Sequence, residues 1–233
     1  LLGWVIRLAP IGTAALIGNA VVQYGWDTLS RLGLFAGALY IGLALVVGAV
    51  YPALLALHGL SPRHFYAKAW PAIQLAFVSR SSAAALPLAE VAAEELGVPR
   101  AYASFAVPIA ATTKMDGCAA VYPAVAAIFI AQFYGITLAP IQYALIVAVS
   151  VLGSAATAGV TGAVVMLTLT LSTLGLPLEG VGLLLAIDPI LDMGRTAVNV
   201  AGQILIPTIV ARREGLLDEA RYNGGAVDDA LIA

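Results

Sequence analysis

Long stretches of this chain carry no charged side chain, and this spacing of charge limits the fold more than any other feature. Charge-free runs cover residues 8–26, 32–62, 117–178 and 196–211. About 20 consecutive apolar residues make a helix long enough to cross the hydrocarbon core of a bilayer. Only 10% of the residues are charged and 61% are hydrophobic, whereas a soluble domain averages about 25% charged. We therefore predict an all-α polytopic membrane protein surrounded by a lipid bilayer.

Polar residues inside the apolar runs separate simple spans from interrupted ones. Residues 3–25 and 33–58 are predicted to be simple spans. From residue 70 onward, small or polar residues break the runs, as at 79–82. Irregular backbone at membrane depth is tolerated only where protein buries it or where it lines a cavity. The interrupted segments are predicted to be a re-entrant hairpin at 70–88, a broken span at 101–134, a second hairpin at 138–174 and a broken span at 181–211.

One structural unit occurs twice in this order, namely a hairpin with a tip of small polar residues followed by a span with a polar break. Such paired interruptions in two halves of a chain indicate a secondary transporter with an inverted repeat. The fold class is therefore predicted to be four transmembrane spans plus two re-entrant helical hairpins. Lys and Arg gather in cytoplasmic loops. Because Arg212, Arg213 and Arg221 follow the last span, the C-terminal tail is predicted to be cytoplasmic.

Six polar side chains form a stripe on the last predicted span. Successive spacings of 4, 3, 1, 3 and 4 residues keep them within roughly a 100° arc of a helix. Each charge at mid-membrane costs about 3 kcal/mol, so the stripe must face the protein interior or a wet cavity. Arg195 can hold a carboxylate with a bidentate fork, and Asp192 can pair with an ammonium group. The alternative is an internal Asp–Arg pair that only locks the helix. The stripe comprises Asp188, Asp192, Arg195, Thr196, Asn199 and Gln203.

A second polar segment interrupts the third predicted span at residues 112–117. Lys114 and Asp116 are two residues apart, so they would not face each other on a regular helix. An unwound stretch ending at Gly117 would bring them together and free backbone carbonyls. Broken helices of this kind bind ions and substrates in transporters.

Four motifs, in order and consistently spaced, resemble those of the dicarboxylate/amino acid:cation symporter family, which includes the glutamate and aspartate transporters. The resemblance covers about residues 1–212. It implies an elevator-type transporter of the plasma (inner) membrane that forms trimers through a scaffold. It also implies that the chain is the C-terminal portion of a longer protein and lacks four N-terminal spans. The motifs are Arg80-Ser81-Ser82, Met115-Asp116-Gly117, Thr157-Ala158-Gly159-Val160 and residues 188–199.

The resemblance also implies a division of the chain and a set of substrate-binding residues. Residues 1–30 would be a scaffold-type span, 31–212 a transport domain with the second hairpin as its gate, and 213–233 the tail. Arg195 would bind the side-chain carboxylate of the substrate, and Asp192 its amino group. That pairing favours an acidic amino acid over a plain dicarboxylate. The other implied substrate contacts are Thr196, Asn199, the backbones of Ser82 and Val160, and Cys118, which replaces a family threonine.

Two departures from the family pattern concern the coupling ion, because Lys114 replaces an asparagine and Gln203 an aspartate. Together they make the site two charge units more positive. Our hypothesis is that Lys114 stands in for one bound cation and that at least two of three sodium sites are lost. The remaining site would use carbonyls of Thr112, Ser154, Ala155 and Thr157, and coupling could instead involve protons at Lys114 or Asp116. The alternative is that Lys114 only fills space. The full predicted coupling set is Lys114, Asp116, Gln203, Asn199, Ala110, Thr112, Ser154, Ala155 and Thr157.

Other functional classes find little support in the sequence. The serines of the first hairpin have no histidine in their segment, so no enzyme is predicted, and a net charge of −2 gives no reason to expect nucleic-acid binding. No cofactor is expected apart from the coupling ion, H⁺ and/or Na⁺. We predict an importer of aspartate or glutamate. A C4-dicarboxylate symporter, a substrate-gated channel and a non-transporting membrane sensor are the alternatives.

Overall fold

The computed structural model describes residues 18, 22, 25–156 and 162–224, and all regular structure within them is helical. This confirms the predicted all-α class for that part of the chain. The first long helix combines α2 (Asp27–Leu45), the π-helical turn η1 (Val46–Val50) and α3 (Tyr51–Leu57). The remaining elements are α4 (Pro62–Ser79), α5 (Ser82–Glu95), α6 (Arg100–Thr113), η2 (Asp116–Val121), α7 (Tyr122–Phe133), α8 (Pro140–Ala156), α9 (Gly162–Leu174), α10 (Glu179–Leu185), α11 (Asp188–Arg213) and α12 (Glu219–Tyr222).

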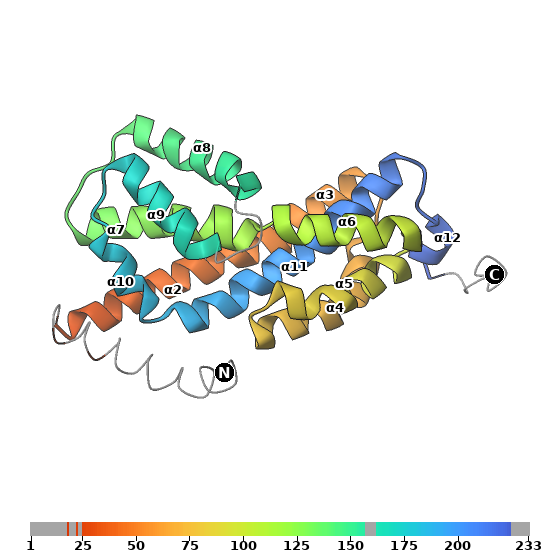
Figure 1. Ribbon diagram of the computed structural model, residues 1–233, viewed down its shortest axis with the longest axis horizontal. Coiled ribbons are helices and arrows are strands. Elements are labelled where there is room, and N and C mark those ends of the chain that lie inside the picture. Colours follow the sequence, from red (N-terminus) through yellow and green to blue (C-terminus); the bar gives the residue numbers. More distant parts are fainter. Residues whose placement is uncertain (1–17, 19–21, 23–24, 157–161, 225–233) are drawn as a thin grey trace.

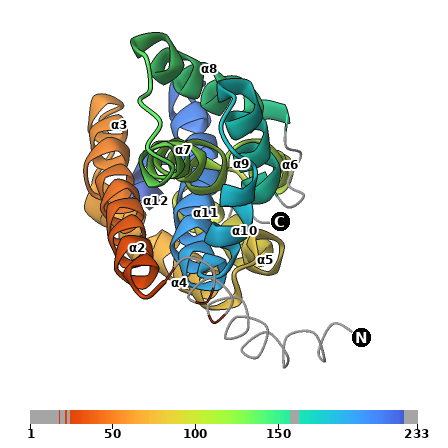
Figure 2. The ribbon, with the colours of Figure 1, turned by 90° about the vertical axis from the view of Figure 1, so that its left-hand side faces the viewer.

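Helix α11 lies at the centre of the molecule, as the end-on view in Figure 2 shows. It contacts α2, α3, α4, α5, α6, η1 and η2, and 16 of its 26 residues are buried. The buried residues include polar members of the predicted stripe, Arg195, Thr196, Asn199 and Gln203. Because protein surrounds the polar face of α11, its charged side chains avoid contact with lipid.

The two pairs of helices predicted as hairpins lie toward opposite ends of the molecule, α4–α5 at one end and α8–α9 at the other (Figure 1). The first pair is longer than the predicted 70–88, because its outer turns continue beyond the apolar run and pack against α11. In the second pair, residues 157–161 lie outside the described part of the chain.

Among the described residues, two helices, Asp27–Leu57 and Arg100–Phe133, are long and apolar enough to cross a membrane by length and composition. They correspond to the spans predicted at 33–58 and 101–134. The span predicted at 3–25 lies outside the described residues, apart from residues 18, 22 and 25. The count of four spans stays a prediction.

The short helix α12 is tied to the loops at the ends of α3 and α5. Asp218 N donates to Gly97 O at 2.9 Å, and the Tyr222 hydroxyl donates to Ser61 O at 2.8 Å. Gly97 has φ +83°, and a Cβ there would collide with the Asp218 carbonyl, so both its conformation and its packing require glycine. Burial raises the pKa of Tyr222 to about 12.

Candidate functional site

A cavity of about 650 Å³ lies between α11 and four other segments. Three of the four motifs that carried the family resemblance contribute to its wall. Among the predicted substrate-binding residues, Ser82, Cys118, Asp192, Arg195, Thr196 and Asn199 line the cavity. Val160 lies outside the described residues. The remaining lining residues are Arg80, Ser81, Ala83, Leu86, Pro108, Ala111, Thr112, Met115, Ala163, Val164 and Asp188.

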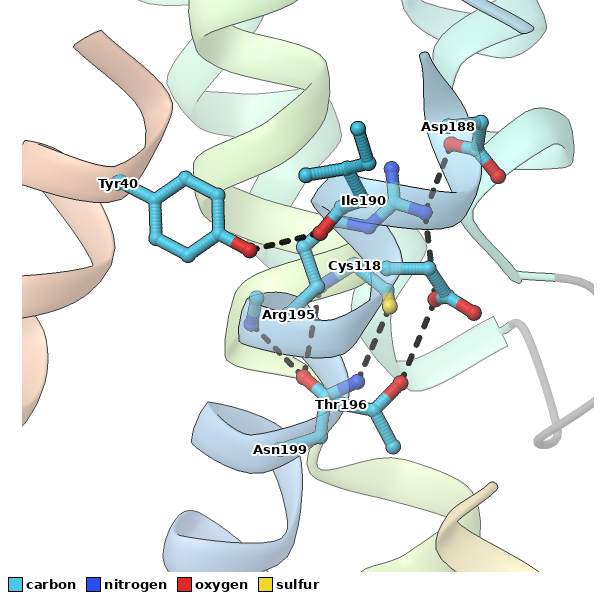
Figure 3. A network of polar contacts seen from close by, with 9 residues as sticks. Tyr40, Cys118, Asp188, Ile190, Arg195, Thr196 and Asn199 are labelled. Carbon is cyan, nitrogen blue, oxygen red and sulfur yellow. Dashed lines mark hydrogen bonds and ion pairs between the residues drawn. The ribbon is translucent and has the colours of Figure 1, made fainter. Parts of the chain in front are cut away.

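Arg195 is the central charge of the cavity, although only 1% of its side chain is exposed. Its Nη2 atom lies 2.8 Å from Asp188 Oδ1 and 3.2 Å from Asp192 Oδ1, and Figure 3 shows the guanidinium beside Asp188. Its Cζ atom is 4.1 Å from the centre of the Tyr122 ring, which adds a cation–π contact. Its Nε and Nη1 atoms are buried and have no hydrogen-bond partner among the described residues. The internal Asp–Arg pair therefore forms but leaves two donors for a further acceptor.

Asn199 and Thr196 connect the charged groups to the broken span. Asn199 Oδ1 accepts a hydrogen bond from Gly117 N at 2.8 Å, and Asn199 Nδ2 donates to Cys118 Sγ at 3.1 Å. One turn earlier, the Thr196 hydroxyl donates to Asp192 Oδ1 at 3.3 Å. Figure 3 shows this chain of contacts. It fixes α11 against the start of η2, so the break in the span and the charged stripe form one unit.

The junction of α4 and α5 supplies the opposite wall. Helix α4 ends at Ser79, and the next residue, Arg80, has left-handed backbone angles of φ 55° and ψ 33°. The Ser81 hydroxyl then caps α5 by accepting a hydrogen bond from Ala84 N at 3.2 Å. Because Ser81 and Ser82 both line the cavity, the N-terminus of α5 faces it. The partial positive charge there favours an anionic group in the cavity.

The expected contact between Lys114 and Asp116 is confirmed. The backbone leaves the helix at Lys114 and Met115, and Lys114 Nζ lies 2.8 Å from Asp116 Oδ2. Gln203 Nε2 donates to the carbonyl of Lys114 at 3.2 Å. The carbonyl of Ala110 accepts from Lys114 N at 2.8 Å.

The predicted carbonyl site for sodium is only partly described. Thr112 lines the cavity and its hydroxyl donates to Ile109 O at 2.8 Å. Ser154 and Ala155 belong to the end of α8, next to the residues outside the described part of the chain. Thr157 is one of those residues. This site stays a prediction.

Sequence reasoning missed three tyrosines that support the site. Tyr122 stacks on Arg195, and Tyr40 donates from α2 to the carbonyl of Ile190 at 2.7 Å. Tyr51 is 1% exposed and donates to Asp116 Oδ2 at 2.6 Å. A tyrosine in the middle of an apolar run needs a partner for its hydroxyl, and that signal was available in the sequence.

Comparison with known proteins places these features in one family. The model of the sodium:dicarboxylate symporter family matches residues 1–213. The chain is 41% identical over 217 residues to an uncharacterized symporter of Haemophilus influenzae, covering 91% of this chain and 49% of that protein. It is 37% identical over 222 residues to the L-cystine uptake protein TcyP of Bacillus anthracis, covering 94% and 48%. It is 36% identical over 220 residues to the proton/sodium-glutamate symport protein of Bacillus subtilis, covering 93% and 51%.

The chain thus spans about half the length of the curated relatives it matches. The match confirms the family predicted from the four motifs and the expectation of a transporter. The chain belongs to the sodium:dicarboxylate symporter family, whose members are integral membrane transporters and not enzymes.

Proposed function

We propose that the full-length protein is a secondary active symporter that imports an acidic amino acid, aspartate or glutamate, driven by a cation gradient. The observation that carries this proposal is the buried Arg195, which lines the cavity and has two donor atoms without a hydrogen-bond partner among the described residues. A substrate carboxylate would accept from these donors and form the strong, planar pair that arginine favours. The N-terminus of α5 would favour a second carboxylate on the opposite wall.

Asp192 gives the site its preference for an amino acid. Its Oδ1 atom accepts from Arg195 and Thr196, and its side chain is 28% exposed. A carboxylate has about four lone-pair sites, so Asp192 retains capacity to accept from a substrate ammonium. A plain dicarboxylate has no such group and would gain nothing from this residue.

The proposed mechanism follows the family resemblance, with residues 31–212 as a transport domain that moves like an elevator against a scaffold in a homotrimer. Residues 1–30 would belong to the scaffold, and the second hairpin, 138–174, would be the gate. The position of α11 between the two pairs of helices (Figure 1) supports this arrangement. The protein would lie in the plasma (inner) membrane with its C-terminal tail in the cytoplasm.

We further propose coupling to protons or to fewer sodium ions than the family pattern implies. Lys114 and Gln203 replace two residues that supply sodium ligands in sodium-coupled members. Asn199 also belongs to the predicted coupling set, and its side-chain oxygen accepts a hydrogen bond from the backbone N–H of Gly117. Asn199 therefore has less capacity to bind a cation.

Cystine is a second candidate substrate, because the chain is 37% identical to an L-cystine uptake protein. Cystine also carries carboxylate and ammonium groups that suit Arg195 and Asp192. Competition decides between the two, since excess glutamate should block labelled aspartate uptake more strongly than excess cystine if the acidic amino acids are the substrates.

The test is labelled aspartate uptake into proteoliposomes bearing the full-length protein, with sodium and proton gradients imposed separately. Accumulation driven by either gradient supports the proposal, and binding without accumulation would indicate a sensor. Asp192→Ala should abolish aspartate uptake, whereas Asp27→Ala, at an exposed position, should not. Uptake of succinate that persists in Asp192→Ala while wild-type protein ignores aspartate would establish a dicarboxylate carrier instead.

A further inference from the structure

A polar cluster separate from the cavity lining lies where α3, η2 and α11 meet. It comprises Tyr51, Lys114 and Asp116, none of which lines the cavity. Asp116 Oδ2 lies 2.8 Å from Lys114 Nζ and accepts a hydrogen bond from the Tyr51 hydroxyl at 2.6 Å. The Tyr51 hydroxyl is also 3.2 Å from the carbonyl of Val198 on α11. One carboxylate oxygen thus binds an ammonium and a hydroxyl at once.

The backbone builds this cluster with two π-helical turns and one glycine. Turn η1 ends at Val50, directly before Tyr51, and η2 begins at Asp116. Each π-helical turn changes the direction of the side chains that follow it, and such turns are frequent at functional sites. A Cβ on Gly202 would lie 2.6 Å from the Tyr51 hydroxyl, 3.3 Å from Asp116 Oδ2 and 3.4 Å from Lys114 Cε. The three side chains therefore converge over the bare Cα of Gly202.

The residues of this cluster do not suit a sodium ion. Hard cations require several oxygen ligands, and here the carboxylate oxygen already binds the Lys114 ammonium. The neighbouring carbonyl oxygens are also occupied. Ala110 O accepts a hydrogen bond from Lys114 N, and Lys114 O accepts one from Gln203 Nε2. A second cation at Asp116 Oδ2 would be repelled by an ammonium only 2.8 Å from that oxygen.

We propose that the Lys114 ammonium is a tethered cation that keeps one coupling site permanently filled, and that Tyr51 is the positioning residue that holds Asp116 for it. This inference rests on the proposed symport function. Its consequence is that this one site should need a small cation from solution only after the side chain of Lys114 has been removed. A lysine that merely fills space would create no such requirement.

The test is aspartate uptake by full-length Lys114→Ala in proteoliposomes, with and without methylammonium. Loss of a charge-assisted contact should lower uptake at least roughly tenfold, and millimolar methylammonium should restore it with saturation. Lys114→Met fills the space without charge and should not be restored. The control is Lys68→Ala, since Lys68 is the other lysine of the chain and its ion pair with Glu95 is half-exposed. It should behave as wild type with and without the amine.

Tyr51→Phe in the Lys114→Ala background tests the positioning role. The concentration of methylammonium needed for half-maximal rescue should rise roughly tenfold, because Asp116 loses its hydroxyl donor. Aspartate affinity in Tyr51→Phe alone should stay within about threefold of wild type. An unchanged rescue concentration would show that Tyr51 does not position the cation.

The outcomes separate this inference from the proposed function. Wild-type protein that neither binds nor accumulates aspartate refutes the function itself. If wild-type protein takes up aspartate, two results refute the tethered cation alone. One is a Lys114→Ala variant that is fully active without amine, and the other is a folded Lys114→Ala variant that the amine does not rescue. If Lys114→Ala does not fold, Lys114→Asn combined with Gln203→Asp provides the test. That variant should gain a steeper sodium dependence of uptake, and an unchanged dependence would overturn the inference.

Discussion

Replacing Gly117 with alanine should disable the site without altering any side chain in it. Gly117 lies where η2 crosses α11, and its N–H donates to Asn199 Oδ1. A Cβ at this position would be 2.5 Å from the carbonyl oxygen of Arg195 and 2.7 Å from its Cα atom. Because these atoms belong to the backbone, no change of rotamer can relieve the clash.

The structure gives the size of the effect. Ordinary van der Waals contact begins near 3.4 Å, so the two helices must separate by about 1 Å at this point. The same movement would stretch the 2.8 Å bond from Gly117 to Asn199 to about 3.7 Å, beyond hydrogen-bonding distance. Overpacking costs about 1–3 kcal/mol and a lost hydrogen bond about 1 kcal/mol. We expect a loss of about 2–4 kcal/mol from the free energy of unfolding.

Substrate affinity should suffer as well, because the carbonyl displaced by the new methyl group belongs to Arg195. A shift of about 1 Å in the residue that we propose binds the substrate carboxylate should weaken aspartate binding at least roughly tenfold. Calorimetric titration of the full-length protein in detergent measures the affinity, and a thermal melt measures the stability. Gly48→Ala is the matched control, since Gly48 also lies in a π-helical turn but a Cβ added there would have no neighbouring atom within 4 Å among the described residues. A Gly117→Ala protein with wild-type affinity and melting temperature would refute the reasoning.

Three further outcomes are expected. Arg195→Lys keeps the charge but loses the planar fork and the stacking on Tyr122, so the KM for aspartate in an uptake assay should rise at least roughly tenfold; an unchanged KM would contradict the assigned role. Cys118 lines the cavity, so saturating aspartate should slow its modification by a small thiol reagent, followed by mass spectrometry; equal rates with and without aspartate would place the substrate elsewhere. Tyr222→Phe removes the bond to Ser61 and should lower stability by about 1 kcal/mol with aspartate affinity unchanged in the same titration.

Helical periodicity and the cost of placing a charge in lipid were enough to predict the polar stripe on α11 and the contact of Lys114 with Asp116. The stripe on α11 could be placed because helical spacing decides which residues share a face, and its charges had to be buried. The contact of Lys114 with Asp116 was expected only if the backbone unwound there, because the two residues would not face each other on a regular helix. Both predictions required only the positions of residues within a single segment of the sequence.

Contacts between segments were beyond the reach of the same reasoning. The stacking of Tyr122 on Arg195 and the bond from Tyr51 to Asp116 join residues more than 60 positions apart, and no local spacing encodes them. The π-helical turns leave the apolar runs continuous, so hydropathy does not reveal them. The first hairpin was predicted too short because hydropathy marks the apolar core of a helix and omits the polar turns at Pro62 and Glu95.

The short segment from Lys114 to Cys118 supports both the cavity beside Arg195 and the Lys114 cluster. Cys118 and Met115 line the cavity, whereas Lys114 and Asp116 form the cluster. Helix α11 binds this segment twice, through Asn199 at Gly117 N and, one turn later, through Gln203 at Lys114 O. A cation that holds Lys114 and Asp116 in place on the cluster side therefore also fixes the positions of Met115 and Cys118 in the cavity wall. If that cation is the tethered ammonium, the site is preorganised without an ion from solution, and aspartate affinity should depend less on sodium than in a protein whose corresponding site must first be filled.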